Sequence, residues 1–345
     1  MNIISTTLTL TVSVLILFCY ILIGYLLRKF KLVDGSFSKA LSIFTLYVAS
    51  PGMFIQGFLR DFEVSVFLNF LYVFIASLVI HAIFYFIATR MFKKQEDKVR
   101  TALQYASVFA NVGYMGIPLV RDVLGQEFVI YVTAYIIGFN LFQFSLGRYL
   151  FTNDKSYISI KKMFLNPAII PITIGFVLFV TGLGGWFAHC GEICSAKIDV
   201  YEHGVLIAGS AVINHLANAL TGCVAPVSMV LIGSRLAEVD IKAALKDSRV
   251  YLLLLTRLIT FPAIIMVLCI IAHLFGLFTP QLLLILVILS AAPSAANLTI
   301  FSEIYNGLPA FSGELVAICT LSSVISMPLI AFIMSYLTSV LPVLF

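Results

Sequence analysis

Charged residues are scarce in this sequence of 345 residues. Asp, Glu, Lys and Arg together make up 11% of the chain, against roughly 25% in a soluble domain. Hydrophobic residues make up 61%, and the mean hydropathy is +1.08. A soluble domain of this size cannot bury so much apolar surface and still cover itself with polar groups. The composition therefore excludes a soluble enzyme and a disordered or fibrous chain, and it indicates an integral membrane protein.

Motifs of membrane enzymes and pumps are also absent. The sequence has no His-Glu-x-x-His zinc motif, no Gly-x-Gly-Asp and no phosphate loop, so we expect no enzyme. The longest connection, Gly184–His203, is too short for a soluble domain. It holds His189, Cys190, Cys194 and His203, which could bind a metal or form a disulfide, but Cys-x-x-x-Cys alone is a weak signal. We expect no metal and no other cofactor, and the pairing of the two cysteines stays open.

Ten apolar runs have the length of a membrane-spanning helix, which needs about 20 predominantly apolar residues. We therefore predict an all-α polytopic membrane protein of ten transmembrane helices joined by short polar connections. The predicted spans are Thr6–Leu27, Ala40–Phe58, Val64–Thr89, Thr101–Val120, Phe128–Leu150, Phe164–Leu183, Val205–Ser234, Val250–Phe275, Gln281–Ile300 and Phe311–Tyr336.

The basic residues are distributed unevenly between the two ends of these spans. No basic residue precedes the first span, whereas Arg28, Lys29 and Lys31 follow it at once, the reverse of the order in a cleaved signal peptide. With the N-terminus outside, 17 of the 21 basic residues fall in inner connections, and the others are Arg60, Arg121 and Lys197 in outer connections and Arg257 inside a span. Since cytoplasmic loops carry the excess of Lys and Arg, we predict a plasma or inner membrane protein with both termini on the extracytoplasmic side.

Helix-breaking residues recur at matching positions in the two halves of the chain. The second and seventh spans each place a proline in mid-span, Pro51 and Pro226. The fourth and ninth spans are interrupted by Asn111–Pro118 and Ala292–Asn297, each fourth in its half. Since five is an odd number of spans, the second repeat, residues 151–345, must be inverted relative to the first, residues 1–150. Paired broken helices in inverted repeats point to the substrate site of a transporter.

The same breaks carry a family resemblance. Asn111–Leu119 reads Asn-Val-Gly-Tyr-Met-Gly-Ile-Pro-Leu, and Ala292–Asn297 is followed by the aromatic run Phe301–Asn306. The first segment is similar to the N-x-x-x-M-G-I-P-L segment of the auxin efflux carrier family of permeases, within the bile-acid, auxin and arsenite type of transporters. Gly24-Tyr25 and Met229–Gly233 fit as well, and the resemblance covers essentially the whole chain.

The resemblance implies two inverted five-helix repeats in which the broken fourth and ninth helices cross. Helices one, two, six and seven would form a scaffold that also dimerises, and helices 3–5 and 8–10 would form a mobile transport unit. Family substrates are organic anions: auxin in plants, and small carboxylates such as malate or malonate in bacteria. The short connection Thr152–Met163 and the polar Asn297 depart from the plant members and favour a microbial-type member.

The two breaks form the predicted substrate site. Half-helix N-termini carry unpaired N–H groups and positive partial charge, which suit a carboxylate, and asparagine amides can donate and accept hydrogen bonds. The simpler alternative is that Asn111 and Asn297 only cap half-helices. The predicted substrate-binding residues are Asn111, Gly113, Pro118, Pro293, Ser294 and Asn297.

Carboxylates are missing from the middle of the predicted spans. All 16 Asp and Glu residues lie in connections or near span ends, which disfavours a carboxylate-based cation antiporter, although coupling to sodium or to a proton stays open. Arg257 lies ~12 Å from the inner end of its span, so it could snorkel or line an anion path, and His81 suits a contact between helices. The predicted cavity-lining residues are Gln56, His81, Asn140, Asn214, His215, Asn218 and Arg257, with Gln143 a weaker candidate.

The predicted function is secondary transport of small organic anions, carboxylates in particular, by alternating access of a midplane site. The expected partners are the substrate, the lipid bilayer and a second copy of the chain, and no nucleic acid. The alternatives are an anion-conducting channel and a transporter-like membrane sensor, because broken helices do not separate a carrier from a channel.

Overall fold

The computed structural model describes residues 3–157, 169–195 and 205–344, and this part of the chain is nearly all helical, without a β-strand. Seven of the described helices are long and apolar enough to cross a membrane, and the bent pair Ile169–Val180 and Leu183–His189 makes up to eight. Ten spans were predicted, and the fourth and ninth are not among these seven or eight because each is broken into short helices. The architecture is that of a multi-pass α-helical membrane protein.

The first half of the chain supplies five helical regions. Three of them contain a π-helical segment, which closes i→i+5 hydrogen bonds and is frequent at functional sites. In chain order the elements are α1 (Ile3–Lys29), α2 (Gly35–Phe44), π-helical η1 (Thr45–Ala49), α3 (Ser50–Gln56), α4 (Val64–Met91), α5 (Asp97–Val108), π-helical η2 (Val112–Gly116), α6 (Ile117–Leu124), the 3-10 turn η3 (Gln126–Phe128), α7 (Val129–Phe142), π-helical η4 (Gln143–Gly147), α8 (Arg148–Thr152) and the 3-10 turn η5 (Lys155–Tyr157).

The second half of the chain contains one further π-helical segment. Its elements are α10 (Ile169–Val180), α11 (Leu183–Ser195), α12 (Val205–Leu236), α13 (Ile241–Ala244), α14 (Ser248–Leu254), π-helical η6 (Leu255–Thr260), α15 (Phe261–Leu274), α16 (Pro280–Ala291), α17 (Asn297–Ile304) and α18 (Pro309–Leu344). The connection predicted at Gly184–His203 therefore contains helix α11, which meets α10 at an angle of 87°.

Helices α1 and α12 cross at a pair of glycines. A Cβ atom on Gly24 would lie 2.0 Å from the carbonyl oxygen of Val230, and one on Gly233 would lie 1.9 Å from the carbonyl oxygen of Ile21. Only glycine lets two helix backbones approach this closely, as in other small-residue contacts between membrane helices. Gly24 and Gly233 are therefore required by the packing of the first long helix of each half.

The two matched prolines have different local effects. Pro51 lies in the first turn of α3, directly after the π-helical segment η1. Pro226 lies inside the continuous helix α12. Neighbouring helices and local adjustments of the hydrogen-bond ladder allow such a proline in a membrane helix, so the sequence match at these positions does not extend to the same backbone geometry.

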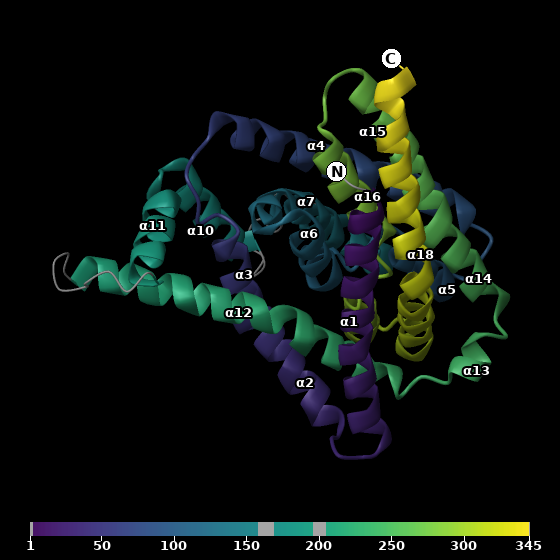
Figure 1. Ribbon diagram of the computed structural model, residues 1–345. Helices are drawn as coiled ribbons and strands as arrows, with labels where there is room; N and C mark the ends of the chain where they lie inside the picture. The colour runs from purple at the N-terminus through teal and green to yellow at the C-terminus, as the bar shows by residue number, and fades with distance from the viewer. Residues whose placement is uncertain (1–2, 158–168, 196–204, 345) are drawn as a thin grey trace.

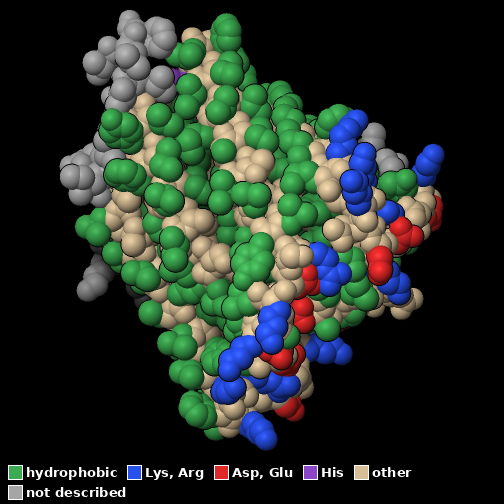
Figure 2. Space-filling view, turned by 90° about the vertical axis from the view of Figure 1, so that its right-hand side faces the viewer, with side chains coloured by type: hydrophobic (Ala, Val, Ile, Leu, Met, Phe, Trp, Pro, Cys, Tyr) green, Lys and Arg blue, Asp and Glu red, His purple; other side chains and the backbone are tan. Residues whose placement is uncertain are grey.

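The exterior separates apolar from charged surface. On the face shown in Figure 2, hydrophobic side chains cover most of the surface, while Lys, Arg, Asp and Glu gather along its lower right edge. Helices α1 and α18 lie side by side, and the start of α1 and the end of α18 are at the same end of the molecule (Figure 1). A broad apolar surface with charges confined to an edge is what a lipid-embedded chain requires.

Candidate functional site

The two broken helices are joined at their breaks by main-chain hydrogen bonds. The N–H of Asn111 donates to the carbonyl oxygen of Pro293 across 2.7 Å, and the N–H of Ala295 donates to that of Phe109 across 2.8 Å. Ala110 and Ser294 thus form an isolated antiparallel bridge. These bonds satisfy backbone groups that would otherwise be orphaned in a membrane interior, and they show directly that the two breaks meet.

Local sequence explains where each helix stops. Ala292 precedes a proline and is extended, with φ −60° and ψ 144°, as expected from the clash that a proline ring makes with a helical predecessor. Phe109, at the end of α5, is also extended, with φ −100° and ψ 113°. Pro118 lies in the first turn of α6, where its missing N–H costs nothing.

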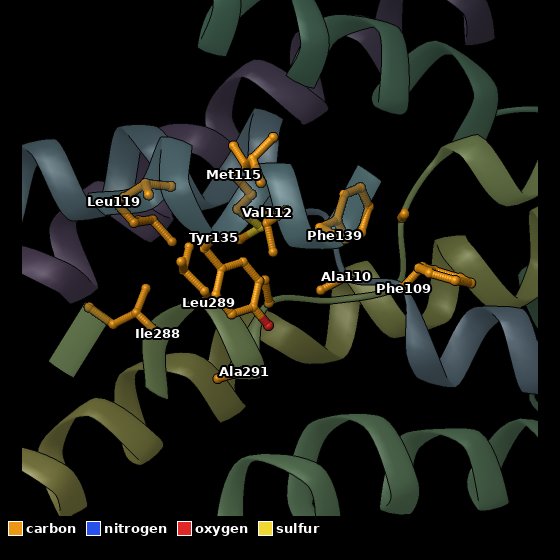
Figure 3. Packing of buried hydrophobic residues seen from close by; sticks show 14 of the residues in the cluster. Phe109, Ala110, Val112, Met115, Leu119, Tyr135, Phe139, Ile288, Leu289 and Ala291 are labelled. Atoms are coloured by element: carbon orange, nitrogen blue, oxygen red, sulfur yellow. The ribbon is translucent and has the colours of Figure 1, made fainter. Parts of the chain in front are cut away.

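Buried apolar side chains pack tightly around the crossing. Figure 3 shows Val112 and Leu289 close to Tyr135 of α7, with Phe109 and Phe139 on the other side of Ala110. All of these side chains are buried. The packing fixes the position of the breaks, so polar side chains that project from them are held in place.

A cavity of about 680 Å³, counted with its open mouth, lies directly beside the crossing. Its walls come from five places: η1 and α3, the first break, α7 and η4, Pro171 of α10, and the second break. The cavity therefore separates the α2–α3 and α10 helices from the crossing. Phe54, Phe139 and Phe144 make an aromatic wall, and among the lining residues no side chain is charged.

Four carboxamide side chains line this cavity, namely those of Asn111, Asn140, Gln143 and Asn297. The Asn297 amide donates from Nδ2 to Gln143 Oε1 across 3.3 Å. Gln143 is fully buried, and its Nε2 has no hydrogen-bond partner among the described residues. The Tyr105 hydroxyl interacts with the Gln143 side chain, and a ligand acceptor or a water molecule would complete the hydrogen bonding of this buried donor.

The capping alternative for the two asparagines does not fit the geometry. The carbonyl oxygen of Asn111 accepts from the N–H groups of Met115 and Gly116, both at 3.3 Å, but its side chain makes no capping bond. Asn297 is the first residue of α17, and the capping position before it belongs to Ala296. Both side chains are therefore available to the cavity.

A second and larger cavity of about 1780 Å³, again counted with its open mouth, starts at the same break. Ala296 lines both cavities. The second cavity runs between α2 and the end of α12 on one side and α17 and the start of α18 on the other. Its charged lining residues are Lys39, Arg235, Glu238, Asp240, Glu303 and Glu314.

The predicted substrate-binding residues divide into two groups. Asn111, Gly113 and Asn297 line the first cavity. Pro118, Pro293 and Ser294 do not line it. Ser294 instead donates from Oγ to the carbonyl oxygen of Ala106 across 2.8 Å, and the two prolines shape the backbone, so these three hold the breaks rather than face the cavity.

Among the predicted cavity-lining residues, Asn140 and the weaker candidate Gln143 line the first cavity, and the others do not. His215 and Asn218 are exposed on α12, and Asn218 donates from Nδ2 to Asn214 Oδ1 across 3.1 Å. Asn214, His215 and Asn218 line neither the first cavity nor the second. Gln56 lies at the end of α3 and accepts a hydrogen bond from Gln126.

His81 lies near the crossing but is enclosed by aromatic rings and does not line the cavity. Its Nδ1–H donates to the carbonyl oxygen of Ser77 across 2.7 Å. Four rings surround the imidazole with centroids 5.3–6.3 Å away, those of Phe109, Tyr135, Phe139 and Phe142. This environment is that of a contact between α4 and α7.

Arg257 neither snorkels nor lines either cavity. It is fully buried in the π-helical segment η6. Its Nε donates to the carbonyl oxygen of Ala292 across 2.9 Å, its Nη1 to that of Ser107 across 3.0 Å, and its Nη2 to that of Ser290 across 2.9 Å. A single guanidinium thus connects the ends of the two half-helices α5 and α16.

The loop cluster of potential metal ligands is only partly described. His203 and the side chains of Cys190 and Cys194 lie outside the described residues. His189 Nδ1 pairs with the carbonyl oxygen of Gly185 at 2.9 Å. Among the described residues, no group of three or more His, Cys, Asp and Glu side chains could hold a metal.

Comparison with known proteins identifies the family. A family model described as "Membrane transport protein" matches residues 9–156 and 151–334. The chain belongs to this family of auxin efflux carrier-type membrane transport proteins. It is also 23% identical over 176 residues to an uncharacterized transporter of Methanocaldococcus jannaschii. That match covers 49% of this chain and spans 57% of the relative's length. The membrane transport family is consistent with a non-enzymatic protein.

Proposed function

We propose that this membrane transport protein is a secondary transporter of small organic anions, carboxylates in particular, and that the cavity beside the crossing is its substrate site. The observation that carries the proposal is the group of four carboxamides in a cavity whose described lining residues include no Asp or Glu. Amide N–H groups donate to a carboxylate, and the absence of a lining acid removes like-charge repulsion.

Helix polarity supports an anion at the same place. The helical segment η2–α6 begins at Val112 and α17 begins at Asn297, both beside the cavity. Helix N-termini carry positive partial charge and unpaired N–H groups. An anion held by Asn111 and Asn297 would therefore lie in a favourable field without a paired basic side chain.

The aromatic wall suggests the size and character of the rest of the substrate. Ligand sites combine apolar walls with a few placed polar groups that fix orientation. Phe54 and Phe139 line the same cavity as the amides. We therefore propose a short carboxylate whose apolar portion contacts these rings.

The broken helices and the bent pair support a ten-span arrangement. Taking α5–α6, α10–α11 and α16–α17 as one span each, the proposed protein has two inverted repeats of five helices. The scaffold would consist of α1, α2–α3, α10–α11 and α12, and the remaining helices would form the transport unit. The cavity then lies between scaffold and transport unit, where movement of one against the other would expose it alternately to each side.

Contacts between these two proposed units suggest which side is closed. Near one end, Gln126 donates to Gln56, and Arg60 Nη1 donates to the carbonyl oxygen of Glu127 across 2.9 Å. Near the other end, the larger cavity separates Lys39 and Arg235 from α17 and α18. With basic connections inside, this is an inward-open state closed by an outer latch, defined as Gln56, Gln126, Arg60 and Glu127.

Orientation and assembly follow the same reasoning. We propose the plasma or inner membrane as the location, with both termini on the extracytoplasmic side because the basic connections would face the cytoplasm. We also propose that the protein dimerises through the scaffold helices, as the family resemblance implies. Size-exclusion chromatography with light scattering in detergent would test the dimer.

Two measurements test the transport proposal. The first is a thermal-stability screen of the purified protein against mono- and dicarboxylates, with and without sodium and at two pH values, since a ligand that binds the native state raises its melting temperature. The second uses proteoliposomes and the compound that stabilises most. Saturable counterflow supports a carrier; single-channel currents would establish the channel alternative, and binding without flux would establish a sensor.

A further inference from the structure

Two half-helices end at the crossing with their carbonyl groups pointing into the protein interior. α5 ends at Val108 and α16 ends at Ala291, so the last carbonyls of each lack an intrahelical partner. Helix C-termini carry negative partial charge. In transporters with broken helices, such carbonyls are where a coupling cation is coordinated.

In this protein the carbonyls are already occupied by a side chain. The guanidinium of Arg257 reaches Ser107 of the first half-helix and Ser290 and Ala292 around the end of the second, with all three N···O distances at 2.9–3.0 Å. No ion pair to Arg257 is found among the described residues. Its charge is therefore balanced by carbonyl dipoles rather than by a carboxylate.

The surroundings of Arg257 keep it in this position. It lies in the π-helical segment η6, and this segment ends directly before Phe261 and Pro262 of α15. The guanidinium carbon lies 5.8 Å from the centroid of the Phe84 ring, and Phe84 stacks on Phe261 with centroids 4.0 Å apart. Cation–π contact and stacking of this kind restrict the side chain, so the charge is fixed at the crossing.

We propose that Arg257 is a built-in cation that takes the place of a coupling ion at the helix crossing. It is a positioning residue: it connects both half-helices and supplies a permanent positive charge beside the anion site. The inference rests on the proposed function in that the anion is the substrate named above. Its consequence is that transport needs no sodium at the crossing.

The test uses Arg257→Ala, which opens a carbonyl-lined space for a small cation. We expect this variant to lose transport to background and to be stabilised against heat, and partly reactivated, by methylguanidinium chloride but not by choline chloride. The wild type should transport equally well in sodium and in choline media. Arg249→Ala is the matched control, because Arg249 lies in α14, directly before η6, and forms an ion pair with Asp247. Methylguanidinium should leave the melting temperature of this control variant unchanged.

Several outcomes would overturn the inference. Saturable sodium dependence of wild-type transport would mean that an ion is required after all. A folded Arg257→Ala variant that transports normally, or one that gains nothing from methylguanidinium, would show that the site is not cationic. If Arg257→Ala does not fold, Arg257→Lys, which keeps the charge but cannot form all three bonds, should retain reduced transport that is still independent of sodium. Stabilisation by methylguanidinium needs no substrate, so it separates failure of this inference from failure of the proposed function.

Discussion

The N–H of Asn111 donates to the carbonyl oxygen of Pro293 across 2.7 Å, which joins the two breaks through their main chains. The backbone of Asn111 is fully used, because its carbonyl oxygen accepts from Met115 and Gly116. Its side chain is thereby left to the cavity. Main-chain bonds thus hold the crossing together, and we propose that its side chains determine what it binds.

Replacement of Gly24 by alanine should destabilise the protein. The new methyl group would lie 2.0 Å from the Val230 carbonyl oxygen, so α1 and α12 would have to separate. Overpacking of this kind costs typically 1–3 kcal/mol, that is, about several degrees in melting temperature. Thermal unfolding in detergent measures the change.

Gly222→Ala is the matched control for that variant. Gly222 lies on the same helix α12, and a Cβ atom there would meet nothing within 4 Å. Since alanine is the better helix former by about 1 kcal/mol, this variant should be as stable as the wild type or more so. Equal destabilisation by both substitutions would contradict the close helix crossing.

Cross-linking the outer latch should stop transport. Gln56 and Gln126 are in hydrogen-bond contact, and in an alternating-access cycle this contact must break when the outer side opens. We expect the double variant Gln56→Cys/Gln126→Cys, in a background without other cysteines, to lose transport when treated with a reducible bifunctional thiol reagent and to regain it on reduction. Each single variant, given the same reagent, should continue to transport. Full transport by the cross-linked protein would show that this contact need not open.

The start of α14 depends on a cap that lies outside the membrane spans. Asp247 accepts a hydrogen bond from the Arg249 N–H across 2.8 Å. Its side-chain bonds with the Arg249 guanidinium lower the pKa of the Asp247 carboxyl below its ordinary value of 3.8. The resulting stabilisation is present above pH 3.8 and is lost as the pH falls through the lowered pKa.

Asp247→Ala should therefore lower the free energy of unfolding by about 0.5–2 kcal/mol at neutral pH, the usual cost of losing a cap. Acid should narrow the difference in melting temperature between this variant and the wild type. Asp97→Ala is the control, because Asp97 is exposed and its ion pair with Arg100 should contribute roughly 0–1 kcal/mol. Melting temperatures of the wild type and both variants, measured between pH 3 and pH 7, test this prediction. A difference between Asp247→Ala and the wild type that stays constant across that range would contradict the titration of Asp247.

The breaks were predictable because proline, glycine and asparagine act on the local backbone. Asn111, Pro118 and Pro293 interrupt apolar runs in the sequence, and the structure breaks the helices at these places. The helix α11 was not predicted, because its glycines and polar residues read as a loop and its bend against α10 depends on packing. The π-helical segments that contain Gln143 and Arg257 likewise have no clear local pattern in the sequence.

The faces of the long apolar helices were harder to predict than their positions. A helix that is hydrophobic all round gives no periodicity to tell the lipid side from the cavity side. His215 and Asn218 were expected at the cavity, but they are exposed on α12 and line neither cavity. The role of Arg257 depends on carbonyl groups of residues 33–150 positions away in sequence, which sequence reasoning could not bring together.

The most direct test of the account is counterflow of the stabilising carboxylate by Asn111→Ala in proteoliposomes. Loss of a hydrogen bond to a charged ligand costs ~1.5–3 kcal/mol, so substrate affinity should fall roughly 10- to 100-fold while the variant stays folded. Asn218→Ala, an exposed asparagine away from the cavity, should transport like the wild type. Normal counterflow by folded Asn111→Ala would contradict the assignment of the substrate site to the crossing.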